Sequence, residues 1–171
     1  GEFIPNWLLD LGFRKVIPGI INYLPGELKR TITLPGFSKF DAIICYEIIF
    51  PGEIVDDQNS LWILNITNDS WFKDSDGPSQ HLRTTCFRAI EEGKSIARCA
   101  NNGISCIIDC NGQIVNSLET DVVGIIEDMM PMKYRNTVFS RYKNGTILIV
   151  LFIVLMTVIF NPKRRKCKIR K

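Results

Sequence analysis

The residues best suited to chemistry lie in the stretch Asp41–Gly52, which reads DAIICYEIIFPG. A short apolar run ends at Cys45, and Tyr46, Glu47 and a Pro-Gly turn follow. A thiolate is a strong nucleophile, and a strand end that opens into a sharp turn would expose it. A cysteine at a strand end is nevertheless more often a packed core residue. The stretch alone therefore leaves two interpretations of Cys45 open, a nucleophile and a buried apolar side chain.

Few other side chains in the sequence suggest chemistry. In an extended strand, the Glu47 side chain would point to the same side as that of Cys45. His81 is the only histidine, and near the start of a predicted helix it is expected to make structural hydrogen bonds. The six cysteines include no CxxC pair. With a single histidine, this pattern does not favour a zinc site, and we expect neither a metal nor a cofactor.

The elements that must position Cys45 alternate in type along the chain. A helix is predicted over Ser79–Glu92, because its apolar residues recur at helical spacing. Strands are predicted at Thr31–Leu34, Phe40–Cys45, 61–66, 95–100, 103–109, 113–118 and 122–129. This order indicates a mixed α/β layer rather than a helical bundle.

Acidic residues near these elements are expected to be solvated. Asp69 and the acids of 74–76 lie in a polar loop and are predicted to face water. Glu91 and Glu92 are expected to pair with Arg88 or Lys94 on the helix surface, where such pairs contribute little stability.

Charge is distributed unevenly. The formal net charge is +3, but residues 163–171 (KRRKCKIRK) hold seven basic residues and no acid. Without them, 14 basic residues face 18 acidic ones, so the body of the protein is mildly acidic. Nucleic-acid binding would depend on the tail alone, and we expect no nucleic-acid partner.

An uncharged apolar segment precedes the tail. Residues 145–160 read GTILIVLFIVLMTVIF. The segment is apolar on every face and is followed directly by basic residues, which predicts a transmembrane helix over 144–161 rather than a core helix. The predicted organisation is thus a catalytic portion at 1–140, the helix, and a basic tail at 162–171. The positive-inside bias places the tail in the cytoplasm and the catalytic portion across the membrane.

Six short motifs occur in a characteristic order. They are GEFIP at 1–5, CYEIIFPG at 45–52, ITNDSWF at 66–72, GPSQH at 77–81, RAIEEGK at 88–94 and RCANNGIS at 98–105. Together they resemble the nitrilase (carbon–nitrogen hydrolase) superfamily, and most closely its apolipoprotein N-acyltransferase branch. The resemblance covers roughly the first 130 residues, and that branch also carries a C-terminal apolar helix and basic tail. It implies an α/β fold, the C-terminal part of a nitrilase-like αββα sandwich.

The resemblance implies roles for individual residues. Cys45 matches the nucleophile of a Glu-Lys-Cys triad, and Glu2 matches an additional glutamate that supports the site. Tyr46 and Glu47 match the pair after the nucleophile, where the backbone N–H of Tyr46 can help to hold an oxyanion.

Two aromatic residues also match the family pattern. Trp71 and Phe72 match a loop near the acyl-chain site. For Trp71, a place in the core remains an equal alternative.

The resemblance also implies a reaction and a location. An acyl chain passes from a membrane phospholipid to the cysteine as a thioester, and then to the N-terminal cysteine amine of a diacylated lipoprotein. The expected location is a bacterial inner membrane, with the catalytic portion on the periplasmic face.

The sequence departs from the family in one respect. The triad Glu and Lys precede the GEFIP motif in family members, so no residue here matches them. We therefore expect a C-terminal portion that is inactive alone and is completed by an N-terminal partner chain. Two alternatives stay open: a hydrolase of small soluble amides, and a catalytically dead, membrane-anchored remnant.

Overall fold

A computed structural model describes residues 10–12, 31–56, 59–72, 75–131 and 135–160. Glu2 and the basic tail lie outside the described residues.

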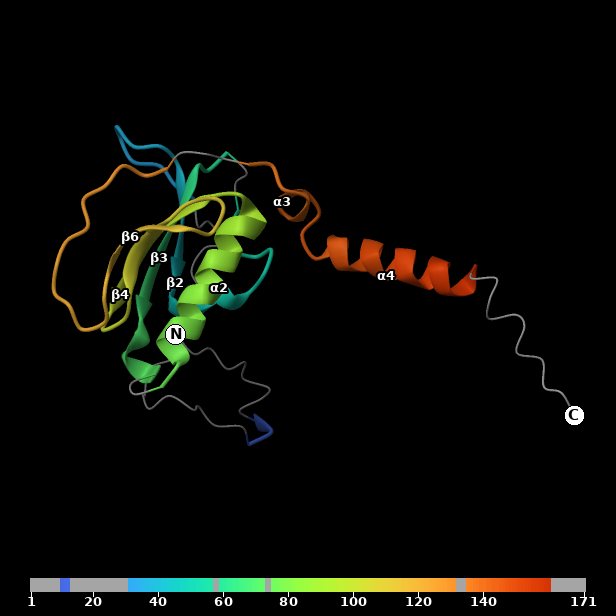
Figure 1. Ribbon diagram of the computed structural model, residues 1–171, viewed down its shortest axis with the longest axis horizontal. Coiled ribbons are helices and arrows are strands. Elements are labelled where there is room, and N and C mark those ends of the chain that lie inside the picture. Colours follow the sequence, from blue (N-terminus) through green and yellow to red (C-terminus); the bar gives the residue numbers. More distant parts are fainter. Residues whose placement is uncertain (1–9, 13–30, 57–58, 73–74, 132–134, 161–171) are drawn as a thin grey trace, which may run out of the picture.

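The body of the protein is a six-stranded mixed sheet whose strand order follows the chain (Figure 1). Its strands are β1 (Thr31–Ile32), β2 (Phe40–Ile44), β3 (Trp62–Asn68), β4 (Ser95–Asn101), β5 (Ser105–Ile108) and β6 (Ile114–Leu118). β2, β3 and β4 are parallel, and the remaining neighbours are antiparallel. The predicted mixed α/β layer is therefore confirmed.

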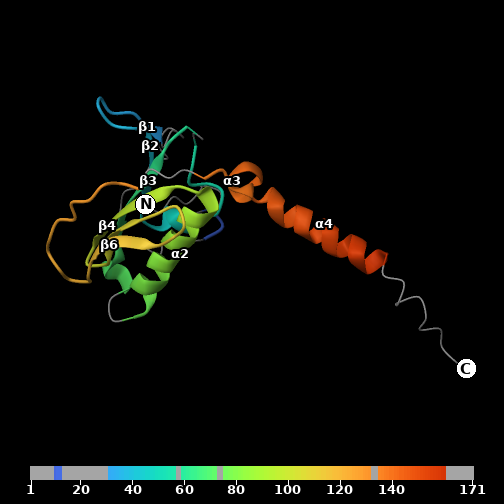
Figure 2. The ribbon, with the colours of Figure 1, turned by 45° about the horizontal axis from the view of Figure 1, so that its top comes forward.

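Helix α2 (Gly77–Glu92) connects β3 to β4 and covers one face of the sheet (Figures 1 and 2). Pro78 lies in its first turn, where a missing N–H is tolerated, and Gly93 ends it with a left-handed φ of 66°. The apolar face predicted for this helix packs on isoleucines of the three parallel strands. The core includes Leu82, Ala89, Ile43, Ile63 and Ile96.

The opposite face of the sheet is open in the part of the chain that the structure describes. Ile44 and Ile66 are register partners on β2 and β3, and they are 64% and 52% exposed. Cys99, the partner of Ile66 on β4, is exposed as well. The sheet therefore has one face packed on α2 and one apolar face whose side chains at the carboxyl end of the parallel strands reach solvent.

The strand predicted at 122–129 is not formed, so this prediction was wrong. This segment is irregular, and the side chains of Val123 and Ile125 are largely exposed. Alternating apolar residues form a strand when they gain a backbone partner and a buried face. Here the segment has neither.

Two helices follow this segment, the short α3 (Val138–Tyr142) and the apolar α4 (Gly145–Ile159). α4 extends away from the sheet in both views, and none of its residues is buried (Figures 1 and 2). Within the described residues, no helix combines the length and apolar character needed to cross a membrane, so the span predicted at 144–161 is not confirmed.

Candidate active site

Cys45 lies where β2 ends and a 3₁₀ turn, η1 (Cys45–Ile49), begins. Its φ of 49° is in the left-handed region, which a residue with a Cβ rarely adopts and which costs about 1–3 kcal/mol. The side chain is half-buried. The structure therefore places the thiol at a strained strand exit, at the carboxyl edge of the parallel strands, where α/β enzymes place their reacting groups.

Glu47 does not lie as an extended strand would place it. Because residues 45–49 turn, its carboxylate folds back and accepts a hydrogen bond from the Ile44 backbone N–H at 2.7 Å. Residues 45–49 are therefore not extended, and strand alternation does not describe the position of this side chain. Glu47 stabilises the turn that presents the thiol.

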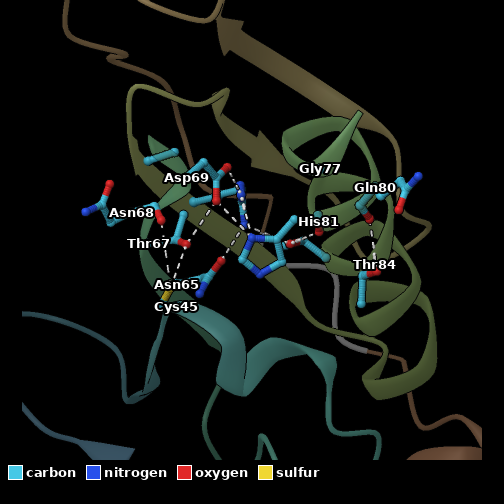
Figure 3. A network of polar contacts seen from close by, with 12 residues as sticks. Cys45, Asn65, Thr67, Asn68, Asp69, Gly77, Gln80, His81 and Thr84 are labelled. Atoms are coloured by element: carbon cyan, nitrogen blue, oxygen red, sulfur yellow. Dashed lines mark hydrogen bonds and ion pairs between the residues drawn. The ribbon is translucent and has the colours of Figure 1, made fainter. Parts of the chain in front are cut away.

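Thr67, on β3, makes the closest polar contact with the thiol among the described residues (Figure 3). Its Oγ1 lies 3.5 Å from Cys45 Sγ and 3.2 Å from Asp69 Oδ1. The Asn68 carbonyl oxygen is 4.0 Å from the sulfur, at the outer limit for a thiol hydrogen bond. Thr67 therefore links the thiol to the carboxylate of Asp69.

Asp69 is buried, so the prediction that it faces solvent was wrong. Its Oδ1 accepts from His81 Nδ1 at 2.9 Å, and its Oδ2 accepts from Arg98 Nη2 at 2.5 Å. Burial pushes the pKa of this carboxyl upward, but the His81 hydrogen bond and the Arg98 charge outweigh it and hold the pKa below its ordinary value. Asp69 is therefore an anion at neutral pH. The structural role expected for His81 is confirmed by the same contact.

The side chain of Arg98, on β4, forms hydrogen bonds with β3 and α2. Nη1 donates to Asn65 Oδ1 at 2.8 Å and to Thr85 Oγ1 at 3.1 Å, and Nε donates to the Ile104 carbonyl at 3.3 Å. The side chain is fully buried. A planar guanidinium with several fixed partners is a rigid support, so it holds Asp69 in place relative to α2, β3 and β4.

Two buried polar atoms of this network, His81 Nε2 and Asn65 Nδ2, lack a hydrogen-bond partner among the described residues. Because Nδ1 of His81 contacts Asp69, Nε2 is the ring nitrogen left for another partner. Both atoms are thus available to a further partner.

Aromatic rings border the network. The rings of Tyr46, Phe72 and His81 lie within 5.6–6.4 Å of one another, centroid to centroid. A Cβ at Gly77 would lie 2.5 Å from Phe72 Cβ, so a glycine is required beside this ring. Trp71 is 67% exposed, so its alternative place in the core is wrong. The structure brings Tyr46 and Phe72 together next to the buried His81.

A second buried polar cluster lies at the opposite, amino end of the parallel strands. Lys94 Nζ donates to Ser60 Oγ at 2.6 Å, and Ser60 donates in turn to Asp41. Glu92 is also buried, and burial raises the pKa of its carboxyl. The surface location predicted for Glu92 and Lys94 was therefore wrong.

The predicted pairing of Glu91 with Arg88 is present as an ion pair, but Arg88 is buried, so its surface location was wrong. Sequence reasoning missed Thr67, Asn65 and Arg98. One signal was available: an arginine inside an apolar strand needs a buried counter-charge. Asp69, at the end of the preceding strand, supplies it.

Comparison with known proteins places the chain in a family. Residues 14–133 match the family model described as carbon-nitrogen hydrolase. The chain therefore belongs to the carbon-nitrogen hydrolase family.

Several relatives share one name. The chain is 36% identical over 166 residues to the apolipoprotein N-acyltransferase of Rhodopseudomonas palustris, covering 95% of this chain and 31% of the relative. It is 37% identical over 160 residues to the protein of that name from Bradyrhizobium diazoefficiens, covering 91% of this chain and 30% of the relative. The predicted resemblance is confirmed, and the chain spans about a third of the length of these relatives.

Among solved structures, an amidase from Nesterenkonia sp. overlaps in part. The match covers 58% of this chain and 41% of the amidase chain, with 19% sequence identity and a TM-score of 0.43.

Proposed function

We propose that this chain is the thiol-bearing portion of an apolipoprotein N-acyltransferase, with Cys45 as the nucleophile. The observation that carries the proposal is the strained position of Cys45 at the exit of β2, beside a buried and fully partnered carboxylate. The similarity to N-acyltransferases over more than nine-tenths of the chain supports it. Because the chain spans about a third of these relatives, the activity remains a proposal.

The reaction would proceed in two steps. The Cys45 thiolate attacks the ester carbonyl of a phospholipid, a thioester forms, and the lysophospholipid leaves as an alcohol after it takes up a proton. The amine of a diacylated lipoprotein's N-terminal cysteine then attacks the thioester, an amide forms, and the amine's proton and the thiolate are released. The backbone N–H of Tyr46 is proposed to donate to the oxyanion in both steps.

The base and the cation of the triad are proposed to come from an N-terminal partner segment. No residue of this chain matches the triad Glu or Lys, and Glu2, the predicted supporting glutamate, lies outside the described residues. The exposed Ile44 and Ile66 support the proposal, because a second sheet packed on them would bury this face. Such packing would complete the predicted αββα sandwich.

The aromatic residues are proposed to contact the acyl chain. Tyr46 and Trp71 are exposed, and the Phe72 ring lies near the rings of both Tyr46 and His81. Exposed aromatic side chains grouped beside a reactive thiol suit an apolar substrate.

We also propose that α4 and its flanking residues hold the protein at a bacterial inner membrane, with the catalytic portion on the periplasmic face. α4 has no charged residue and no buried residue. Its apolar side chains would therefore be stabilised by the hydrocarbon region of a bilayer. The basic residues at 163–171 favour a cytoplasmic C-terminus. Both substrates are lipids, which suits a site at the bilayer surface.

The test is acyl-enzyme trapping. The chain is co-expressed with the N-terminal portion of the Rhodopseudomonas palustris relative and incubated with phospholipid carrying a labelled acyl chain. Mass spectrometry should find the label on Cys45, and hydroxylamine should remove it. Cys45→Ser should abolish labelling, because an alcohol is far less acidic than a thiol.

Cys99→Ser is the matched control, since Cys99 is an exposed thiol on the open face. It should label normally. Label on another cysteine, or full transfer by Cys45→Ser, would refute the proposal.

A further inference from the structure

Thr67 lies between two groups that compete for its single hydroxyl proton. Its Oγ1 is 3.5 Å from Cys45 Sγ and 3.2 Å from Asp69 Oδ1. A hydroxyl donates one hydrogen bond and accepts others, so it can donate to only one of these atoms at a time. Thr67 is buried, and its hydroxyl therefore depends on these neighbours.

Asp69 does not depend on Thr67 for its partners. His81 donates to its Oδ1 and Arg98 donates to its Oδ2. Both oxygens therefore remain hydrogen-bonded when the hydroxyl proton of Thr67 turns away. The carboxylate can release this proton without becoming an unsatisfied buried anion, which would be costly.

We propose that Thr67 is a positioning residue that stabilises the Cys45 thiolate by turning its hydroxyl proton from Asp69 to the sulfur. In the thiol state, Cys45 S–H donates to the Asn68 carbonyl and Thr67 donates to Asp69. When the thiol proton leaves to a base or to solvent, the hydroxyl rotates and donates to the sulfur anion. No proton is transferred from Thr67.

The charged and titratable groups that surround Cys45 come from four elements. They are Tyr46 and Glu47 on its own turn, together with Asp69 after β3, His81 on α2 and Arg98 on β4, which belong to the network that Thr67 joins to the thiol. A substitution at Thr67 leaves all five in place, so a change in the titration of Cys45 would report the hydroxyl itself.

The test measures the pH dependence of Cys45 alkylation by iodoacetamide in the full chain, held in mild detergent, with peptide mass spectrometry to separate the cysteines. Thr67→Val keeps the shape and removes the hydroxyl. We expect it to shift the alkylation midpoint of Cys45 upward by about one pH unit, roughly a tenfold loss of thiolate at neutral pH, since a hydrogen bond to a charged group is lost. Thr67→Ser should retain the parental midpoint.

Cys99 is the internal control, because it lies on the other face of the sheet and its midpoint should not move. An unchanged Cys45 midpoint in Thr67→Val would overturn the proposal. Should Thr67→Val unfold and expose Cys106, Thr67→Ala takes its place, because it also removes the hydroxyl, and it should show the same upward shift of the Cys45 midpoint. Equal Cys45 midpoints in Thr67→Ala and the parental chain would also overturn the proposal.

The inference rests on the proposed function only for the choice of Cys45 as the reactive thiol. Alkylation requires no acyl transfer. The acyl-enzyme experiment and the alkylation experiment can therefore fail independently.

Discussion

Replacing Arg98 by methionine should be among the most destabilising single changes in this protein. Methionine keeps the length and apolar stem of the side chain but removes the guanidinium. The Asp69 carboxylate would then remain buried with His81 as its only strong donor. The acceptors on Asn65 and Thr85 would also lose their partner.

The magnitude follows from these lost contacts. Removing one partner of a buried ion pair costs about 3–5 kcal/mol, because the other charge stays in a poorly solvated site. Domains of this size have a free energy of unfolding of about 5–15 kcal/mol. Arg98→Met should therefore remove a large fraction of the total stability and lower the urea midpoint by about 2 M.

The assay is urea unfolding of the full chain in mild detergent, followed by circular dichroism. Arg83→Met is the matched control, since Arg83 is exposed on α2 and its loss should change the free energy of unfolding by less than about 0.5 kcal/mol. The double variant Asp69→Asn/Arg98→Met should lose at least about 1 kcal/mol less than the sum of the single variants. A loss below about 1 kcal/mol for Arg98→Met, or strict additivity, would refute the reasoning.

Two further predictions concern α2 and the C-terminus. Burial raises the pKa of Glu92 above 4.5, so the stability it contributes is present below pH 4.5 and is lost as the pH rises through the raised pKa. Glu92→Gln should therefore raise the melting temperature by roughly 2–4 °C at pH 8, and much less at pH 4; an equal gain at both pH values would contradict this assignment. A reporter that is active only in the cytoplasm, fused after Lys171, should be active, whereas activity of a periplasmic reporter there would disprove the proposed orientation.

Local patterns in the sequence were sufficient for the elements that present Cys45. The apolar run before the Pro-Gly turn located β2 and its exit, and the helical spacing before Gly93 located α2. Both are properties of neighbouring residues, so a single sequence reveals them.

The environment of the thiol could not be predicted in the same way. Asp69 sits in a polar loop sequence, and its contacts with His81 and with Arg98, 29 residues away, make its burial possible. The position of the Glu47 carboxylate depends on the left-handed backbone conformation of Cys45, and no local sequence pattern predicts that conformation. The segment 122–129 had the alternation of a strand, but strand formation needs a backbone partner, and a single sequence does not specify one.

The order of the strands has a consequence for how the protein is made. Each strand of the sheet pairs with the next one along the chain, from β1 to β6. Each pairing therefore closes only the connection between consecutive strands, which limits the loop-closure entropy that opposes it. As the chain leaves the ribosome, every new strand adds to an edge that already exists. β2 to β4, which carry Ile44, Ile66 and Cys99, are synthesised before α4, so the nascent chain exposes this apolar sheet face before the apolar helix emerges.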